Sequence, residues 1–225
     1  MPRIHFHQQL AQLKDKLLAM AALSQQALEF SVEAYLQRDQ ALSNHVLEIE
    51  EAINAAETTV DEMAYELLAK EQPMAIDLRF ILSVIKINGD LERIGDQSAN
   101  IAEKVLMMKD SPEISLPVDI NKMGECVGIM IRTAIQALLE ADAKMAESVL
   151  LMDDEVDEMN RELQNELVET MEQHPLVTEQ ALYAIIIGRN LERAGDHATN
   201  IAEDVVFWLR GSDVRHKMSM LTEAD

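Results

Sequence analysis

Two segments of this chain, one in each half, are nearly identical. Residues 91–105 read LERIGDQSANIAEKV and residues 191–205 read LERAGDHATNIAEDV, so ten of these fifteen positions are the same at an offset of 100. Upstream the similarity continues more weakly at an offset of 103, where Met20 matches Met123 and Asp39 matches Asp142. Because a repeat of this length is the signature of a duplicated structural unit, we expect both halves to fold alike.

The sequence of each half predicts three long helices. The chain contains only 7 glycines and 5 prolines, and aromatic residues make up 4%, a composition typical of all-α proteins. The predicted helices span residues 8–37, 39–71 and 74–109 in the first half and 117–140, 142–173 and 176–210 in the second. The sequence therefore predicts an all-α protein, two tandem pseudo-symmetric three-helix bundles packed side by side, with a first unit at 1–110 and a second at 111–225.

The predicted helix boundaries rest on residues that suit helix ends. Asp39 and Asp142 are good N-caps for the second helix of each half. Pro73 and Pro175 suit the opening of the third helix, where the missing N–H of proline costs nothing. Residues 109–117 form the linker between the halves, and the polar tail from Gly211 onward is expected to fray.

The duplicated segments carry two stripes of side chains at helical spacing. Apolar residues recur every three or four positions, as in a seam that faces a bundle core. One residue further round, oxygen-bearing side chains recur at steps of four, four and three, which keeps them on one side of the helix. The members of this polar stripe are Glu92, Asp96, Asn100 and Glu103 in the first copy and Glu192, Asp196, Asn200 and Glu203 in the second.

The polar stripe contains two local penalties that both copies retain. Like charges at i, i+4, as in Glu92 and Asp96, destabilise a helix by a few tenths of a kcal/mol, and a mid-helix glycine such as Gly95 costs about 1 kcal/mol relative to alanine. A bound cation would compensate, because hard metal ions prefer carboxylate and amide oxygens. The glycine would let a ligand or a neighbouring helix approach the helix backbone closely. The retained charge pair and glycine also have simpler explanations. These are ion pairs with basic side chains, a tight helix crossing, or duplication alone.

A second set of acidic and amide residues lies on the helix before each stripe. Glu50 and Asn54 are spaced i, i+4 in the first half, and Asp153 and Asp157 occupy the matching positions in the second. These pairs would complete a metal site if they face a polar stripe. The sequence does not determine whether that is the stripe of their own half or of the other half. A solvated face of an acidic helix explains Glu50 at least as well.

The composition and the missing motifs narrow the possible functions. A formal charge of −22 repels nucleic acids and anionic lipids and favours metal ions or basic patches on partner proteins. No apolar stretch reaches the ~18 residues of a membrane span, so the cytoplasm is the expected compartment. The sequence has no Glu-x-x-His, no His-Glu-x-x-His, no Walker A and no Gly-x-Ser-x-Gly motif, which argues against an enzyme.

Three motifs resemble those of a known family. Residues 71–79 read EQPMAIDLR, residues 90–96 read DLERIGD, and residues 190–203 read NLERAGDHATNIAE. In these motifs the chain resembles the PhoU family, bacterial accessory regulators of phosphate uptake, over about residues 5–210. The resemblance implies paired three-helix bundles and metal clusters, of iron, zinc, magnesium or manganese, at paired E(D)-x-x-x-D motifs. Asn54 departs from this pattern, so a site that uses it should bind metal more weakly.

The resemblance also implies a function and its partners. The chain would be a non-enzymatic negative regulator of phosphate uptake and phosphate-starvation signalling. It would contact the ATPase subunit of a phosphate ABC transporter and a membrane sensor histidine kinase, and so reach the membrane only through partners. A homodimer is expected, since exposed Met-rich helices suit one. A metal-binding helical scaffold and a carboxylate metalloenzyme are the alternatives. Any role of residues 77–79 would be one-sided, because Thr178-Glu179-Gln180 replaces them in the second half.

Overall fold

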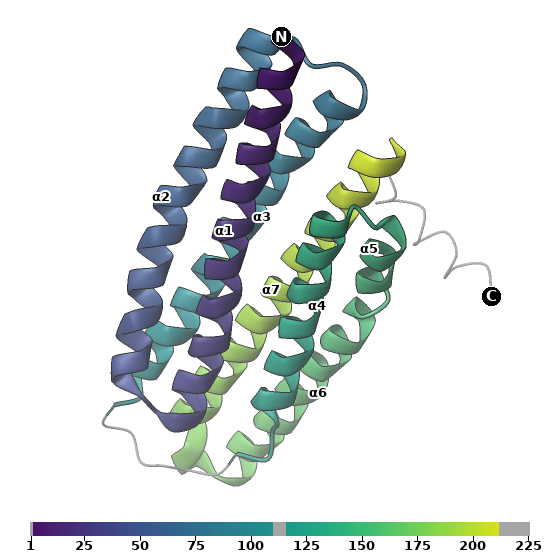
Figure 1. Ribbon diagram of the computed structural model, residues 1–225. Helices are drawn as coiled ribbons and strands as arrows, with labels where there is room; N and C mark the ends of the chain where they lie inside the picture. Colours follow the sequence, from purple (N-terminus) through teal and green to yellow (C-terminus); the bar gives the residue numbers. More distant parts are fainter. Residues whose placement is uncertain (1, 110–115, 212–225) are drawn as a thin grey trace, which may run out of the picture.

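The computed structural model describes residues 2–109 and 116–211, in which the chain forms seven α-helices and one 3₁₀ turn and no strand. The first half contains α1 (Pro2–Gln37), α2 (Gln40–Glu71) and α3 (Ile76–Met107). The second half contains α4 (Ile120–Glu140), α5 (Ala143–Leu150), α6 (Asp153–Gln173), the 3₁₀ turn η1 (Pro175–Val177) and α7 (Thr178–Arg210). The predicted all-α class with two repeated helical bundles is confirmed (Figure 1).

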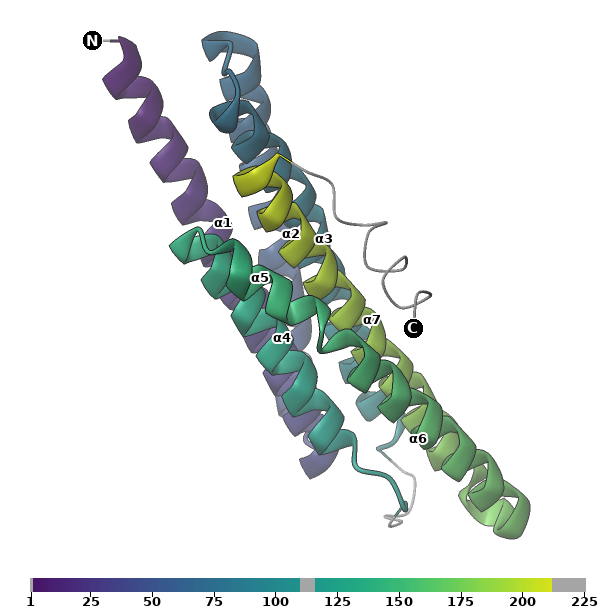
Figure 2. The ribbon, with the colours of Figure 1, turned by 90° about the vertical axis from the view of Figure 1, so that its right-hand side faces the viewer.

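The two halves lie side by side, with α3 and α7 against each other (Figure 1 and Figure 2). These two helices run antiparallel, since the start of α3 bonds the end of α7: Arg79 Nε donates to the Trp208 carbonyl at 3.1 Å, and Ser83 Oγ donates to the Asp204 carbonyl at 2.9 Å. A second contact between the halves joins α1 to α4. Buried residues of all these helices form one continuous apolar core.

The apolar seam of the duplicated segments faces this core, as the heptad spacing predicts. Every seam residue of the described helices is almost completely buried, because the long helices bury their apolar stripes against one another. The buried seam consists of Ile87, Leu91, Ile94, Ile101 and Val105 on α3 and of Ile187, Leu191, Ala194, Ala198, Ile201 and Val205 on α7. The adjacent polar stripe is thereby placed at the edge of the helix contacts.

Aspartate side chains begin three of the helices. Asp39 Oδ1 accepts hydrogen bonds from the backbone N–H groups of Ala41 and Leu42, and Asp142 Oδ1 does the same for Lys144 and Met145. Both predicted N-caps are therefore confirmed, and each satisfies donors that have no partner inside the helix. Asp119 caps α4 through the N–H of Lys122 in the same way.

The prolines lie slightly earlier than predicted relative to the third helices. α3 begins at Ile76, three residues after Pro73, because Gln72 and Ala75 both have positive φ and the chain turns sharply between them. Pro175 opens the 3₁₀ turn η1, which leads directly into α7 at Thr178. At the other end of the chain, α1 already begins at Pro2 instead of residue 8.

The predicted single helix over 142–173 is wrong, because the structure divides it into α5 and α6. The break lies at Leu151 and Met152, immediately before Asp153. The first turn of α6 holds three consecutive acidic residues, Asp153, Asp154 and Glu155. Negative charge is favourable at a helix N-terminus and unfavourable at a C-terminus, so this run favours a new helix start. In the first half α2 continues without interruption through the matching positions.

Two predictions fall largely outside the described residues. The linker 109–117 includes residues 110–115, and the tail from Gly211 includes residues 212–225, and neither segment is described. The predicted division into units at 1–110 and 111–225 therefore stays a prediction at its boundary. Gly211 itself ends α7 in the left-handed conformation that glycine adopts readily, with φ of 69°.

Candidate metal centre

Carboxylates of α6 and α7 converge at the surface of the second half. Asp157 of α6 and Glu192 and Asp196 of α7 each offer an oxygen, and these oxygens all lie within 4.8 Å of one another. Asp153, one helical turn before Asp157, accepts a hydrogen bond from Thr199 Oγ1 at 3.2 Å. These four residues, Asp153, Asp157, Glu192 and Asp196, form the C-terminal cluster.

The charges of the C-terminal cluster repel one another. Burial raises the pKa of Asp196 to about 6, helped by the negative charges of Glu192, Asp153 and Asp157. Burial and neighbouring carboxylates also raise the pKa of Glu192 and of Asp153. Each of these carboxyl groups is therefore harder to ionise than in water. A divalent cation would reverse this effect, because it would bring an opposite charge to partly desolvated oxygens.

The matching positions of the first half bring together a different set of side chains. Burial raises the pKa of Glu92, and the charges of Asp96 on α3 and of Glu57 and Glu50 on α2 raise it further. Glu50, Glu57, Glu92 and Asp96 therefore form an N-terminal cluster. The guanidinium of Arg93 lies over this cluster, with Nε 3.4 Å from Glu92 Oε2 and Nη1 3.7 Å from Asp96 Oδ2.

The N-terminal cluster is thus already partly neutralised by the chain itself. Besides the two ion pairs of Arg93, the amide of Asn54 donates to Glu50 Oε1, which occupies an oxygen that a metal would need. The ion-pair explanation that the sequence left open for Glu92 is therefore correct in this half. The C-terminal cluster presents four carboxylates at the corresponding places, so its donor set fits a hard divalent cation better.

The structure also answers which stripe the preceding helix faces. In both halves the pair on the preceding helix, α2 or α6, faces the stripe of its own half: Asp153 and Asp157 lie against Glu192 and Asp196, and Glu50 lies near Glu92. Sequence reasoning missed Glu57. The available signal was its spacing, since Glu57 and Asp61 repeat the E-x-x-x-D pattern one turn beyond Asn54.

The remaining stripe residues lie elsewhere. Asn200 Nδ2 donates to Asp90 Oδ1 of α3 at 3.2 Å, and the same oxygen lies 2.8 Å from His197 Nδ1. Asn200 therefore joins the two halves. Glu203 lines a polar groove between α3 and α7 together with Lys86. In the first half Asn100 and Glu103 are exposed. Metal ligation by these four residues stays a prediction.

The polar α3–α7 groove has a volume of about 470 Å³. It is lined by residues of both signs, and Lys86 forms an ion pair with Asp204 at 2.8 Å inside it. Because Glu57, Glu92 and Arg93 also line this groove, the N-terminal cluster opens into the contact between the halves.

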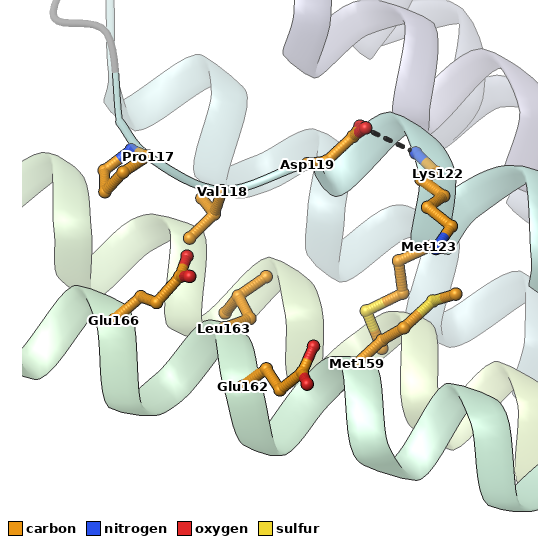
Figure 3. A pocket seen from close by; sticks show the side chains of 9 residues that line it. All are labelled: Pro117, Val118, Asp119, Lys122, Met123, Met159, Glu162, Leu163 and Glu166. Atoms are coloured by element: carbon orange, nitrogen blue, oxygen red, sulfur yellow. Dashed lines mark hydrogen bonds between the residues drawn. The ribbon is translucent and has the colours of Figure 1, made fainter.

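A second hollow lies where the chain enters α4 and passes over α6. Figure 3 shows Pro117 and Val118 above Leu163 and Glu166, with the thioethers of Met123 and Met159 at one side. Its volume is about 270 Å³. Glu162 and Glu166 come from α6 and belong to neither acidic cluster, so this hollow is separate from the candidate metal centre.

The mid-helix glycines of the two duplicated segments, Gly95 and Gly195, differ in their surroundings. A Cβ on Gly95 would lie 3.0 Å from Ile53 Cδ1 of α2 and 3.3 Å from its Cγ2, so Gly95 allows α2 and α3 to cross closely. A Cβ on Gly195 would meet nothing nearer than Val156 Cγ1 at 3.6 Å, an ordinary contact. In the first half the neighbouring helix, and not a ligand, therefore accounts for the glycine.

This difference predicts opposite effects for the same substitution. Gly195→Ala should raise the free energy of unfolding by up to about 1 kcal/mol, because alanine is the better helix former. Gly95→Ala should lower it by about 1 kcal/mol, because the strain against Ile53 outweighs that gain. Urea unfolding of both variants measures the difference, and equal effects of the two substitutions would contradict the assigned role of Gly95.

Fold and site together define a class: all-helical, two-repeat proteins with an acidic cluster on each repeat. The PhoU domain family matches residues 17–105 and 120–205, which are the two repeats. The chain belongs to the PhoU family. It is 37% identical over 212 residues to a phosphate-specific transport system accessory protein PhoU homolog of Pseudomonas putida, covering 94% of this chain and 83% of that protein. A homolog of Thermotoga maritima is 32% identical over 213 residues, covering 94% and 92%.

Solved structures of the family share the fold. The crystal structure of PhoU from Pseudomonas aeruginosa superimposes with a TM-score of 0.89 at 36% identity, covering 92% of this chain and 100% of that one. The phosphate transport system regulatory protein PhoU from Streptococcus pneumoniae gives 0.86 at 26% identity, covering 93% and 99%. The family consists of accessory regulatory proteins and not of enzymes, in agreement with the prediction. Among the described residues, no helix combines the length and apolarity that a membrane crossing requires.

Proposed function

We propose that this chain is a negative regulator of phosphate uptake and of phosphate-starvation signalling. Membership of the PhoU family makes it an accessory, regulatory protein of phosphate transport. The proposed partners are the ATPase subunit of a phosphate ABC transporter and a membrane sensor histidine kinase, with the chain in the cytoplasm and at the membrane only through them. The observation that carries the proposal is that the family match covers both repeats.

The C-terminal cluster is the proposed metal site of this regulator. Asp157, Glu192 and Asp196 would hold a divalent cation, with Asp153 beside them. Iron, zinc, magnesium and manganese are the candidates, and the all-oxygen donor set favours the harder ions among them. The N-terminal cluster would bind metal more weakly, because Arg93 already pairs with Glu92 and Asp96. The metal would fix α6 against α7.

Deleting the gene for this chain tests the regulatory role. A phosphate-starvation reporter should then be active in phosphate-rich medium at the level that starved cells show, because the restraint on the sensor kinase is lost. Expression of the chain from a plasmid should restore repression, and this serves as the control. A reporter that stays silent in the deletion strain would overturn the proposal.

Association with the proposed partners is tested separately. Tagged chain should co-purify with the transporter ATPase subunit and with the sensor kinase from cells grown in high phosphate. A sedimentation experiment on the purified chain tests the proposed homodimer. A strictly monomeric chain would exclude the homodimer without affecting the regulatory role.

A further inference from the structure

An apolar groove between α1 and α4 lies apart from both acidic clusters. Its floor is formed by Val32 and Leu36 of α1 and by Gly124 and Gly128 of α4, and its volume is about 270 Å³. Leu36 is 50% exposed. The two helices contact each other. A hollow of this size can hold the anchoring side chains of a protein segment.

The two glycines of the floor have different reasons to be there. A Cβ on Gly124 would lie 2.9 Å from both methyl groups of Val32, so the contact between α1 and α4 requires this glycine. Gly128 is buried, and among the described residues a Cβ on it would come within 4 Å of the guanidinium of Arg132 alone, at 3.3 Å. Gly128 therefore leaves room for the flexible Arg132 side chain, and not for the backbone or side chains of α1. The matching position in the first repeat holds Gln25.

The rim of the groove is acidic. Glu29, Glu33 and Glu125 line it, against one cation, Arg132, whose Nη1 is 3.0 Å from Glu29 Oε1. Glu33 accepts a hydrogen bond from the amide of Gln37, and Glu125 accepts one from the amide of Asn121. These amide partners leave the negative charge of both carboxylates in place.

From the shape and the charge of this groove we infer that it docks a basic amphipathic segment of a partner protein. One or two aliphatic side chains of that segment lie against the exposed Leu36 and displace the flexible Arg132 side chain from Gly128, and flanking lysine or arginine residues meet Glu33 and Glu125. A second copy of this chain fits less well, because two chains of formal charge −22 would bring like charges together at an acidic rim.

A synthetic peptide tests this docking surface directly. The probe is a labelled amphipathic peptide of roughly 15 residues, with leucines at helical spacing and lysine or arginine elsewhere, and its twin has serines in place of the leucines. Binding is followed by fluorescence anisotropy at about 0.15 M salt, where remote charges are largely screened. The leucine peptide should bind at least about tenfold more tightly than its twin. Equal binding of the two peptides would mean that only net charge acts, and would overturn the inference.

Gly128→Leu fills the groove without changing the net charge. This variant should lose at least about tenfold in affinity for the leucine peptide. Gly89→Leu is the matched control, because no described residue lies within 4 Å of a Cβ on Gly89 of α3, and Gly89 lies outside this groove. It should bind as the natural chain does. Unchanged binding by Gly128→Leu, or a dimer of the natural chain that only this substitution dissociates, would overturn the inference.

Two exposed rim residues provide a test that does not depend on filling the groove. The double variant Glu33→Gln, Glu125→Gln should bind the leucine peptide several-fold more weakly and with a smaller salt dependence. Glu162→Gln with Glu166→Gln, on α6, makes the same charge change away from the groove and should leave binding unchanged. Equal losses in the two double variants would overturn the inference.

The biological use of the groove rests on the proposed adaptor role, but the two ideas fail separately. If Gly128→Leu abolishes neither peptide binding nor reporter repression, the docking surface is wrong and the regulatory role stands. If the peptide binds as expected but deletion of the gene leaves the reporter silent, the regulatory role is wrong and the docking surface stands.

Discussion

Replacing Glu192 and Asp196 together by glutamine and asparagine should weaken divalent metal binding on the order of 100-fold. The two residues supply two of the three converging carboxylates of the C-terminal cluster, so the variant loses both charge and ligand strength at one place. Isothermal titration with Mn²⁺, Mg²⁺ and Zn²⁺, and metal analysis of protein purified without chelators, measure the loss. The fold should persist, because neither residue belongs to the apolar core.

The first half provides the matched control for this experiment. Glu92→Gln with Asp96→Asn makes the same chemical change in the N-terminal cluster, where Arg93 already pairs with both carboxylates. We expect this variant to leave the tighter binding event unchanged and to remove at most a weaker one. If both double variants weaken the tight site equally, or if the natural chain binds no divalent ion at millimolar concentration, the assignment of the C-terminal cluster as the metal site is wrong.

Much of the fold could be predicted because the sequence repeats itself. Heptad spacing separated the buried seam, such as Leu91 and Leu191, from the polar stripe one residue further round. The preference of aspartate for the N-cap position correctly predicted the helix starts at Asp39 and Asp142. The break between α5 and α6 was missed, because an acidic run inside a helical pattern reads equally well as a solvated face. The effect of this acidic run on helix stability depends on where the helix, and with it the helix dipole, begins.

The candidate site was less accessible to sequence reasoning than the fold. Periodicity fixes the side of a helix on which a residue lies, but it does not fix which helix lies opposite. The sequence therefore grouped Asn200 with Asp196, although the antiparallel contact of α3 and α7 places Asn200 against Asp90. From Asn54 the sequence did predict weaker metal binding in the first half. It did not predict that Arg93 pairs with both Glu92 and Asp96 there, because these ion pairs depend on side-chain conformation.

The stability of the metal-free chain should decrease as the pH rises from about 4 to above 6. The folded-state pKa of Asp196 is raised from 3.8 to about 6 by burial and by the neighbouring carboxylates. A raised pKa means that the folded state holds a proton that the unfolded state has already released. The stabilising contribution is therefore fully present below pH 3.8 and is lost as the pH passes through 6.

Asp196→Asn should remove this dependence and make the metal-free chain more stable at pH 7.5 by about 1 kcal/mol. A full shift of about two units corresponds to roughly 3 kcal/mol, but Asp196 is partly exposed and solvent screens its interactions. Urea unfolding in the presence of a chelator, at pH 5 and at pH 7.5, measures the effect. Asp96→Asn is the control.

Because a bound cation reverses the repulsion, added Mn²⁺ should make the natural chain the more stable one at pH 7.5. A variant less stable than the natural chain without metal would show that the four carboxylates do not oppose one another, and the physical reason for metal binding would be lost.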